Sequence, residues 1–199
     1  MGSLYQRLTQ STGASDSPRD DPRTDPDASP ITRPRRLRLR ARTLERWIEG
    51  TVQTVHPRLI DLLNGADGGG LIVAEDVSIA VDDGARSRTP AASSTATLNT
   101  NTWLFASPLD DDDRSGRDSF ERVSKYIDRA RVGIGPYDIV GEIHLIPDTT
   151  LQTVQILARA RFVVLTGATI ERDRDRPTST PLGVVCVNLR LVDFIAPIA

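Results

Sequence analysis

The chain has 199 residues, of which 38% are apolar and only 5% aromatic, and its formal net charge is −2. This length suits one large domain or two small ones, and the low apolar content indicates that part of the chain does not join a core. The charge balance excludes binding of polyanions by bulk attraction, so any affinity for nucleic acid has to come from a local patch. No run approaches the roughly 18 apolar residues that a membrane span needs.

Residues 1–34 are predicted to be a disordered N-terminal tail. Mixed charges and small residues fill this segment, and prolines recur in it at Pro18, Pro22, Pro26, Pro30 and Pro34. Such a composition cannot bury enough apolar surface to offset the entropy that ordering costs.

The first predicted strand, 36–42, is rich in arginine. Its apolar side chains (Leu37, Leu39, Ala41) alternate with arginines (Arg36, Arg38, Arg40, Arg42). A period of two places the apolar side chains on a buried face and the arginines on a solvated face. A row of arginines about 7 Å apart can follow a phosphate backbone, but no aromatic side chain shares the face for base stacking. We interpret the row as a solvated strand face, and keep Arg36, Arg38 and Arg40 as candidate ligand-binding residues.

Seven further segments have the apolar patterning of strands. They are 46–55, 70–81, 98–107, 129–135, 137–146, 161–171 and 183–196. Gly50 and Gly141 lie inside two of these segments, where glycine usually marks a bulge or bend, and Gly135-Pro136 indicates a turn.

The remaining segments are connectors. The sequence RLIDLLN at 58–64 predicts a short helix or loop, and 83–97 predicts a polar loop. Residues 110–128 form an acidic linker that opens with four aspartates and is predicted to end in a short helix at 118–128, because its apolar residues have helical spacing.

Two stretches of the chain resemble each other. Ile48, Gly50 and Val52 match Ile139, Gly141 and Ile143, and further blocks match in the same order downstream. We therefore predict a mainly β fold of two repeated, small, barrel-like antiparallel units, at 35–109 and 129–199.

The segment Leu59–Asn64, read as LxDxLN between two predicted strands, resembles a family of uncharacterised bacterial tandem β-domains. The resemblance covers 36–199, although 151–157 (LQTVQIL) departs from the pattern in the second repeat. It implies tandem β-domains and carries over no active site.

A weaker resemblance is to the PilZ domain, which binds cyclic-di-GMP. Arg36 and Arg40 match its RxxxR motif, and Asp76 and Ser78 begin its (D/N)xSxxG motif, in which Val81 replaces the glycine. This resemblance implies a cyclic dinucleotide as ligand.

No catalytic, metal or cofactor motif stands out. His56 and His144 lie at different places in the two repeats, and with Cys186 they do not make a zinc pattern. No serine has an evident base beside it in the pattern. We therefore predict a non-enzyme without a cofactor.

The predicted function is that of a structural or protein-interaction module whose exposed strand edges engage a protein partner or another copy of the chain. The single cysteine fits a reducing compartment, so a cytoplasmic location is expected, away from membranes. The alternative is binding of an anionic ligand, nucleic acid or nucleotide, by the arginine strand 36–42.

Overall fold

The computed structural model describes residues 33–65, 70–81, 90–110, 126–145, 150, 160–172 and 178–198. Of the predicted disordered tail 1–34, residues 1–32 lie outside the described residues, as does the segment 151–159. The described residues belong to one unit, Arg33–Ala199.

The described part of the chain is mainly β, as predicted. Its first five strands are β1 (Arg35–Arg42), β2 (Arg46–Thr54), β3 (Leu71–Val81), β4 (Ala91–Asn99) and β5 (Phe105–Pro108). The other five are β6 (Tyr126–Ile134), β7 (Tyr137–Leu145), β8 (Phe162–Arg172), β9 (Thr178–Asn188) and β10 (Phe194–Pro197). The helical elements are α1 (Leu59–Asn64) and the 3₁₀ helices η1 (Thr100–Thr102) and η3 (Leu189–Leu191).

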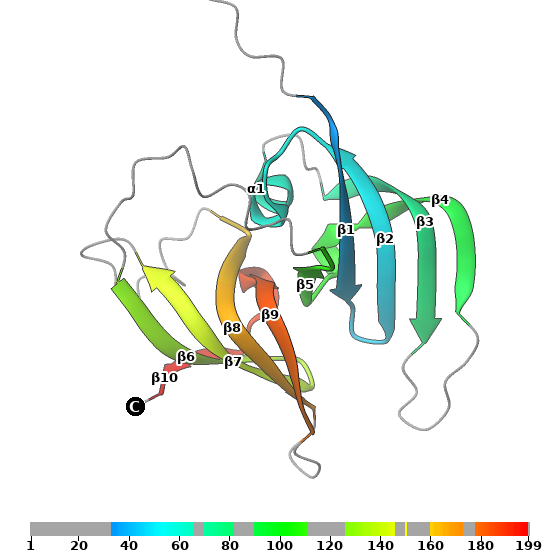
Figure 1. The fold of residues 1–199 in the computed structure, drawn as a ribbon. Helices are drawn as coiled ribbons and strands as arrows, with labels where there is room; N and C mark the ends of the chain where they lie inside the picture. Colours follow the sequence, from blue (N-terminus) through cyan, green and yellow to red (C-terminus); the bar gives the residue numbers. More distant parts are fainter. Residues whose placement is uncertain are drawn as a thin grey trace, which may run out of the picture. The chain divides into compact units, whose positions relative to one another are not determined.

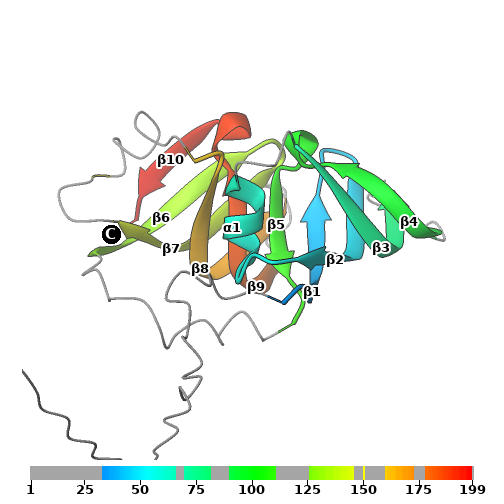
Figure 2. The ribbon, with the colours of Figure 1, turned by 90° about the horizontal axis from the view of Figure 1, so that it is seen from above.

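All ten strands belong to one antiparallel sheet with the order β10-β6-β7-β8-β9-β5-β1-β2-β3-β4 (Figure 1). β5 lies between β1 of its own half and β9 of the second half. Within the described residues, β4 pairs only with β3 and β10 only with β6, so these two strands form the edges of the sheet. Figure 2 shows the two edge strands at opposite ends and α1 lying over the middle of the sheet.

The apolar face of β1 is buried, and each half of the sheet has a core. Leu37, Leu39 and Ala41 are in the core of the first half, which confirms the inward face predicted from their alternation. This core also takes in Phe162 and Cys186 from the second half. The core of the second half in turn takes in Leu104 and Phe105 from the first half. The two cores are therefore completed by each other's residues.

Two β-bulges lie opposite the strand glycines, as the sequence indicates. The register of β2 with β3 shifts around Gly50, and that of β7 with β8 shifts around Gly141. A Cβ at Gly141 would lie 3.1 Å from both Leu165 Cβ and Thr166 O. At Gly50 the closest atom would be Ala74 Cβ at 3.3 Å. Glycine is thus needed where the bulged neighbour comes close.

Three predicted elements are wrong in their bounds. Residues 91–97, predicted as loop, form most of β4, because β3 offers a ladder that small polar residues can join without an apolar pattern. The predicted strands 98–107 and 183–196 are each interrupted by a 3₁₀ helix. The side chains of Asn99 and Asn188 accept hydrogen bonds from the main-chain N–H two residues later and start these turns.

The helix predicted at 118–128 is wrong where the structure describes it. Tyr126 and Ile127 begin β6 and pair with Leu145 and His144 of β7. Their apolar spacing fits either a helix or a strand, and the ladder with β7 decides for the strand. The rest of the predicted helix lies outside the described residues.

We predict that Gly141→Ala destabilises the fold by about 1–3 kcal/mol, the usual cost of overpacking. The atoms that the new methyl would meet are backbone or Cβ atoms, which cannot swing aside. Gly50→Ala, with slightly wider spacing, is the matched control and should cost at least about 1 kcal/mol less. Urea unfolding measures both, and equal losses would contradict the assigned packing.

Candidate functional site: the arginine strand and the sheet edges

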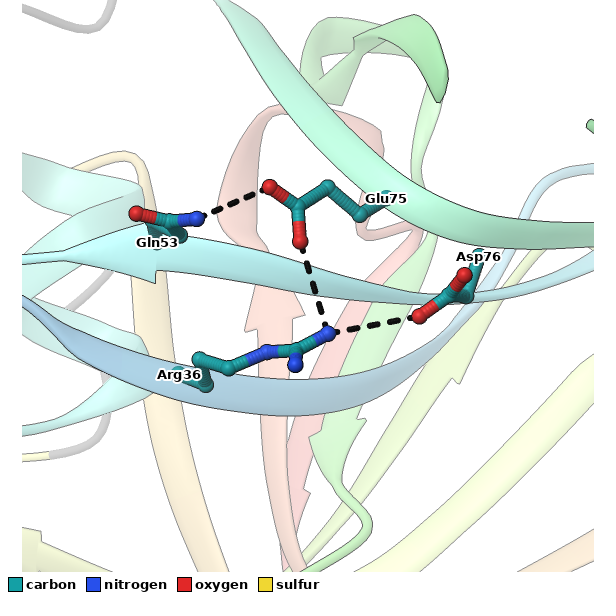
Figure 3. A network of polar contacts seen from close by, with 4 residues as sticks. All are labelled: Arg36, Gln53, Glu75 and Asp76. Atoms are coloured by element: carbon teal, nitrogen blue, oxygen red, sulfur yellow. Dashed lines mark hydrogen bonds and ion pairs between the residues drawn. The ribbon is translucent and has the colours of Figure 1, made fainter. Parts of the chain in front are cut away.

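Arg36 on β1 faces two carboxylates of β3. Its Nη2 lies 3.4 Å from Glu75 Oε2 and 3.3 Å from Asp76 Oδ2 (Figure 3). The other oxygen of Glu75 accepts a hydrogen bond of 2.8 Å from Gln53 Nε2 on β2. The cation predicted to be a ligand contact is therefore part of a polar network that runs across three strands.

The other two candidate arginines also have carboxylate partners. Arg40 Nη2 lies 2.6 Å from Glu49 Oε1 on the neighbouring β2, and Arg38 Nη1 lies 3.7 Å from Asp110 Oδ1 after β5. Exposed pairs of this kind contribute only about 0–1 kcal/mol each to stability. Their main effect is to compensate the charge of the arginine row.

A hollow of about 510 Å³ lies over this face of β1, β2 and β3. It is lined by Arg36, Arg38, Glu49, Gly50, Thr51, Asp76, Ser78, Leu109 and Asp110. Two guanidinium groups thus face three carboxylates. Arg36, Asp76 and Ser78 all line the hollow, whereas Arg40 is turned toward Glu49 and is not in the lining. A phosphate entering the hollow would have to displace carboxylates from the arginines.

Asp76 on the wall of the hollow has an unusual backbone. Its φ is 51°, in the left-handed region, and it occupies the β3 bulge opposite Gly50. The same place in the β8 bulge holds Gly167, with a φ of 56°. Glycine is the usual residue there, and aspartate is one of the few others that tolerate this conformation. The motif of the second resemblance includes Asp76, but it does not indicate the left-handed backbone of this residue.

Arg42 is the exception in the arginine row, because it is buried and does not lie on the solvated face predicted for it. Its Nε donates to Tyr137 Oη, and its Nη2 donates to Leu44 O at 3.3 Å. Its guanidinium lies 5.2 Å from the ring centroids of both Trp47 and Tyr137. Arg42 is the last residue of β1, and its contact with Tyr137 of β7 shields it from solvent.

The junction of the halves is a short ladder between β5 and β9. Phe105 pairs with Val187 and Ala106 with Cys186. Asn188 extends the ladder, since its N donates to Leu104 O at 2.9 Å and its Nδ2 donates to Trp103 O at 3.0 Å.

Side chains beside the ladder fasten α1 and η1 to β8. Asn64 exchanges two hydrogen bonds with the main chain of Phe162, at 2.9 and 2.8 Å. Arg161 donates to Thr100 Oγ1 and to Leu63 O. Burial, and after it the charge of Arg190, lowers the pKa of Arg161. No sequence pattern indicated these side-chain contacts, because their partners are far apart in the chain.

The edge strand β4 differs from the rest of the sheet in its chemistry. Its nine residues, AASSTATLN, include no charge and no proline, and most are exposed. The neighbouring β3 adds two exposed apolar side chains, Leu71 and Val73. At the opposite edge, β10 exposes Phe194. Long edges without charge or proline are open to pairing with another strand.

Other site types find little support. Across the described residues, no three His, Cys, Asp or Glu side chains gather in the manner of a metal site. No helix in this part of the chain has the length and apolar character to cross a membrane. Cys186 is buried beneath the junction. Comparisons with protein-family models, with curated proteins and with solved structures each find no match.

We predict that Asp76→Ala destabilises the fold by about 1–2 kcal/mol more than Asp76→Gly does, because only alanine is strained at this φ. Both variants lose the ion pair to Arg36, so the difference isolates the backbone. Urea unfolding measures the two free energies. Equal stabilities would show that residue 76 is not held in the left-handed region.

Proposed function

We propose that the protein is a non-enzymatic structural and protein-interaction module that works in the cytoplasm by pairing its sheet edges with another polypeptide strand. The observation that carries the proposal is β4, a nine-residue edge strand without charge or proline that has a described partner on one side only. Main-chain pairing at such an edge supplies affinity, and side chains beside it supply specificity. Leu71 and Val73 on the neighbouring β3 are exposed apolar side chains that could supply this specificity.

We also propose that the two halves are copies of one small barrel-like unit. Three long-range main-chain hydrogen bonds of the first half have counterparts in the second. Leu104 N to Arg42 O corresponds to Asp193 N to Gly133 O, Leu109 N to Arg38 O corresponds to Ile198 N to Arg129 O, and Thr100 N to Gly70 O corresponds to Leu189 N to Arg161 O. The bulges opposite Gly50 and Gly141 support the same correspondence.

The alternative, an anionic ligand bound by the arginine strand, is favoured by one observation, that Arg36 and Arg38 line the hollow. The carboxylates around them oppose it, because each outward arginine already has an acidic partner. Nucleic acid binding would require these pairs to open.

We predict that oligonucleotides bind weakly and without a steep salt dependence, as measured by fluorescence anisotropy at low and near-physiological salt. Changing Arg36, Arg38 and Arg40 to Glu should then leave the signal unchanged. The matched control changes the exposed Arg58, Arg129 and Arg190 to Glu. Tight binding that falls with a slope of about −2.7 in log–log form, as three phosphate contacts give, and that only the first variant abolishes would replace our proposal with the alternative.

We predict that a photo-crosslinking amino acid in place of Thr97 on β4 captures polypeptide in cells that make the protein. The same amino acid in place of His144, which is exposed on the interior strand β7, is the matched control and should capture little. Mass spectrometry identifies the adduct. Equal capture at the two positions would contradict pairing at the β4 edge.

A further inference from the structure

We propose that copies of the chain assemble head to tail, with β10 of one copy pairing with β4 of the next in the way that β5 pairs with β9 inside each chain. The inference rests on the proposed function and on the correspondence of the two halves, and it names the partner strand. By that correspondence β9 is the counterpart of β4, and β10 is the counterpart of β5. The internal junction is thus an occupied example of a contact whose two surfaces, β4 and β10, have no strand on their outer side among the residues that the structure describes.

The two asparagines that start the 3₁₀ helices align the strands residue by residue. Asn99 and Asn188 each end a strand and each accept a hydrogen bond from the N–H two residues later. Counting from them, Thr97 is the counterpart of Cys186 and Leu98 of Val187, while Phe194 and Ile195 are the counterparts of Phe105 and Ala106. The internal pairs Phe105–Val187 and Ala106–Cys186 then predict the pairs Phe194–Leu98 and Ile195–Thr97 between copies.

Two of the residues that the internal junction buries on the β9 side have exposed counterparts at the β4 edge, whereas Val187 and its counterpart Leu98 are both buried. Cys186 and Asn188 are buried, whereas Thr97 and Asn99 are exposed. The neighbouring strands, β8 beside β9 and β3 beside β4, show the same difference in exposure. Phe162, beneath α1, is 1% exposed, and its counterpart Leu71 is 61% exposed.

The β5 side shows the same contrast. Phe105 is 1% exposed and packs edge-on against Tyr137, with ring centroids 5.5 Å apart. Its counterpart Phe194 is 40% exposed. An aromatic side chain like the one that anchors one end of the internal contact is therefore present at the open end, where its ring lies over Gly133 and stays partly exposed.

A hollow marks the place where Phe194 of another copy would insert. Inside the chain, Leu104 and Leu44 lie against the turn at Gly135, and Phe105 packs against the ring of Tyr137. In the first half, Leu44 is the counterpart of Gly135, and Arg46 is the counterpart of Tyr137. Leu44 and Arg46 lie in the lining of a hollow of about 340 Å³, together with Thr43, Glu45, Ile48 and Thr102.

The main chain of β4 has N–H groups that point outward and could donate hydrogen bonds to β10 of another copy. Thr100 N donates to Gly70 O on the β3 side, and alternate N–H groups of a strand point the same way. The N–H groups of Thr97 and Asn99 therefore point away from β3. In the internal junction, Asn188 N and Nδ2 donate to Leu104 O and Trp103 O. The same two groups of Asn99 would donate to Asp193 O and Val192 O of the next copy.

A contact between two different surfaces is heterologous, so it generates either a closed ring or an open filament. The competing arrangement is two-fold pairing of one β4 with another β4. It would leave Phe194 exposed and the 340 Å³ hollow unfilled, whereas head-to-tail pairing uses both.

Disulfide trapping between two variants tests the order and the register. Thr97→Cys and Ile195→Cys are prepared separately in a Cys186→Ala background and oxidised alone and as an equal mixture. We expect the mixture to give linked dimers joined between positions 97 and 195, at least tenfold more than either variant gives alone. Thr95→Cys mixed with Ile195→Cys is the matched control, since residue 95 shares the edge but lies two pairs out of register, and it should link at least severalfold less.

Each other outcome overturns the inference in a recognisable way. Links between two copies of Thr97→Cys would show two-fold edge pairing, which refutes head-to-tail order and leaves the proposed function standing. No links in any mixture would refute self-assembly through these strands. Photo-crosslinking at Thr97 then decides the proposed function separately, because capture of a different protein would uphold it and capture comparable with that at His144 would not.

Sedimentation velocity of the full chain over a range of concentrations gives a second measurement without cysteines. We expect species heavier than the monomer, and at least tenfold weaker self-association in Phe194→Asp. Val55→Asp is the matched control, because Val55 is an exposed apolar residue outside both edge strands. A monomer at all concentrations, or equal weakening in the two variants, would overturn the inference.

Discussion

The short ladder between β5 and β9 is the contact on which the rest of the structure depends. β5 has four residues, yet it pairs with β1 on one side and β9 on the other. Leu104 and Phe105 complete the core of the second half, and Phe162 and Cys186 complete the core of the first. A contact that closes both cores places residues from distant parts of the chain together, such as Arg42 with Tyr137. The energetic coupling of the halves is thus a consequence of apolar burial at one seam.

The arginine strand shows how a fold can change the meaning of a sequence pattern. The alternating arginines by themselves form a row of positive charge. Neighbouring strands supply Glu49 and Glu75, and the chain after β5 supplies Asp110, so that the row faces acidic partners. The hollow above it is polar but not strongly positive. This is why strand pairing, and not phosphate binding, is the function that we propose for the molecule.

The edges of the sheet carry that proposal because the molecule contains both an occupied and an open version of what we take to be one surface. Cys186 and Asn188 are buried where β9 meets β5, and the corresponding Thr97 and Asn99 are exposed on β4. An open edge has main-chain donors and acceptors that are satisfied only by water until another strand arrives. Pairing with a strand of the same kind as β5 satisfies them with geometry that the chain already uses.

Local patterns in the sequence determined the strands with clear apolar alternation, the inward face of β1, the turn at Gly135-Pro136 and the bulges opposite Gly50 and Gly141. These features depend on neighbours in the chain, which periodicity and glycine placement record. Only the tertiary structure decided that 91–97 is a strand, that Arg42 is buried, that Arg36 meets Glu75 and Asp76, and that β5 joins the two halves. Each of these features depends on partners in other segments of the chain. The edge strand β4, made mostly of alanine, serine and threonine, has no apolar pattern by which the sequence could indicate a strand. Its ladder with β3 holds it in place, and burial of its side chains contributes little.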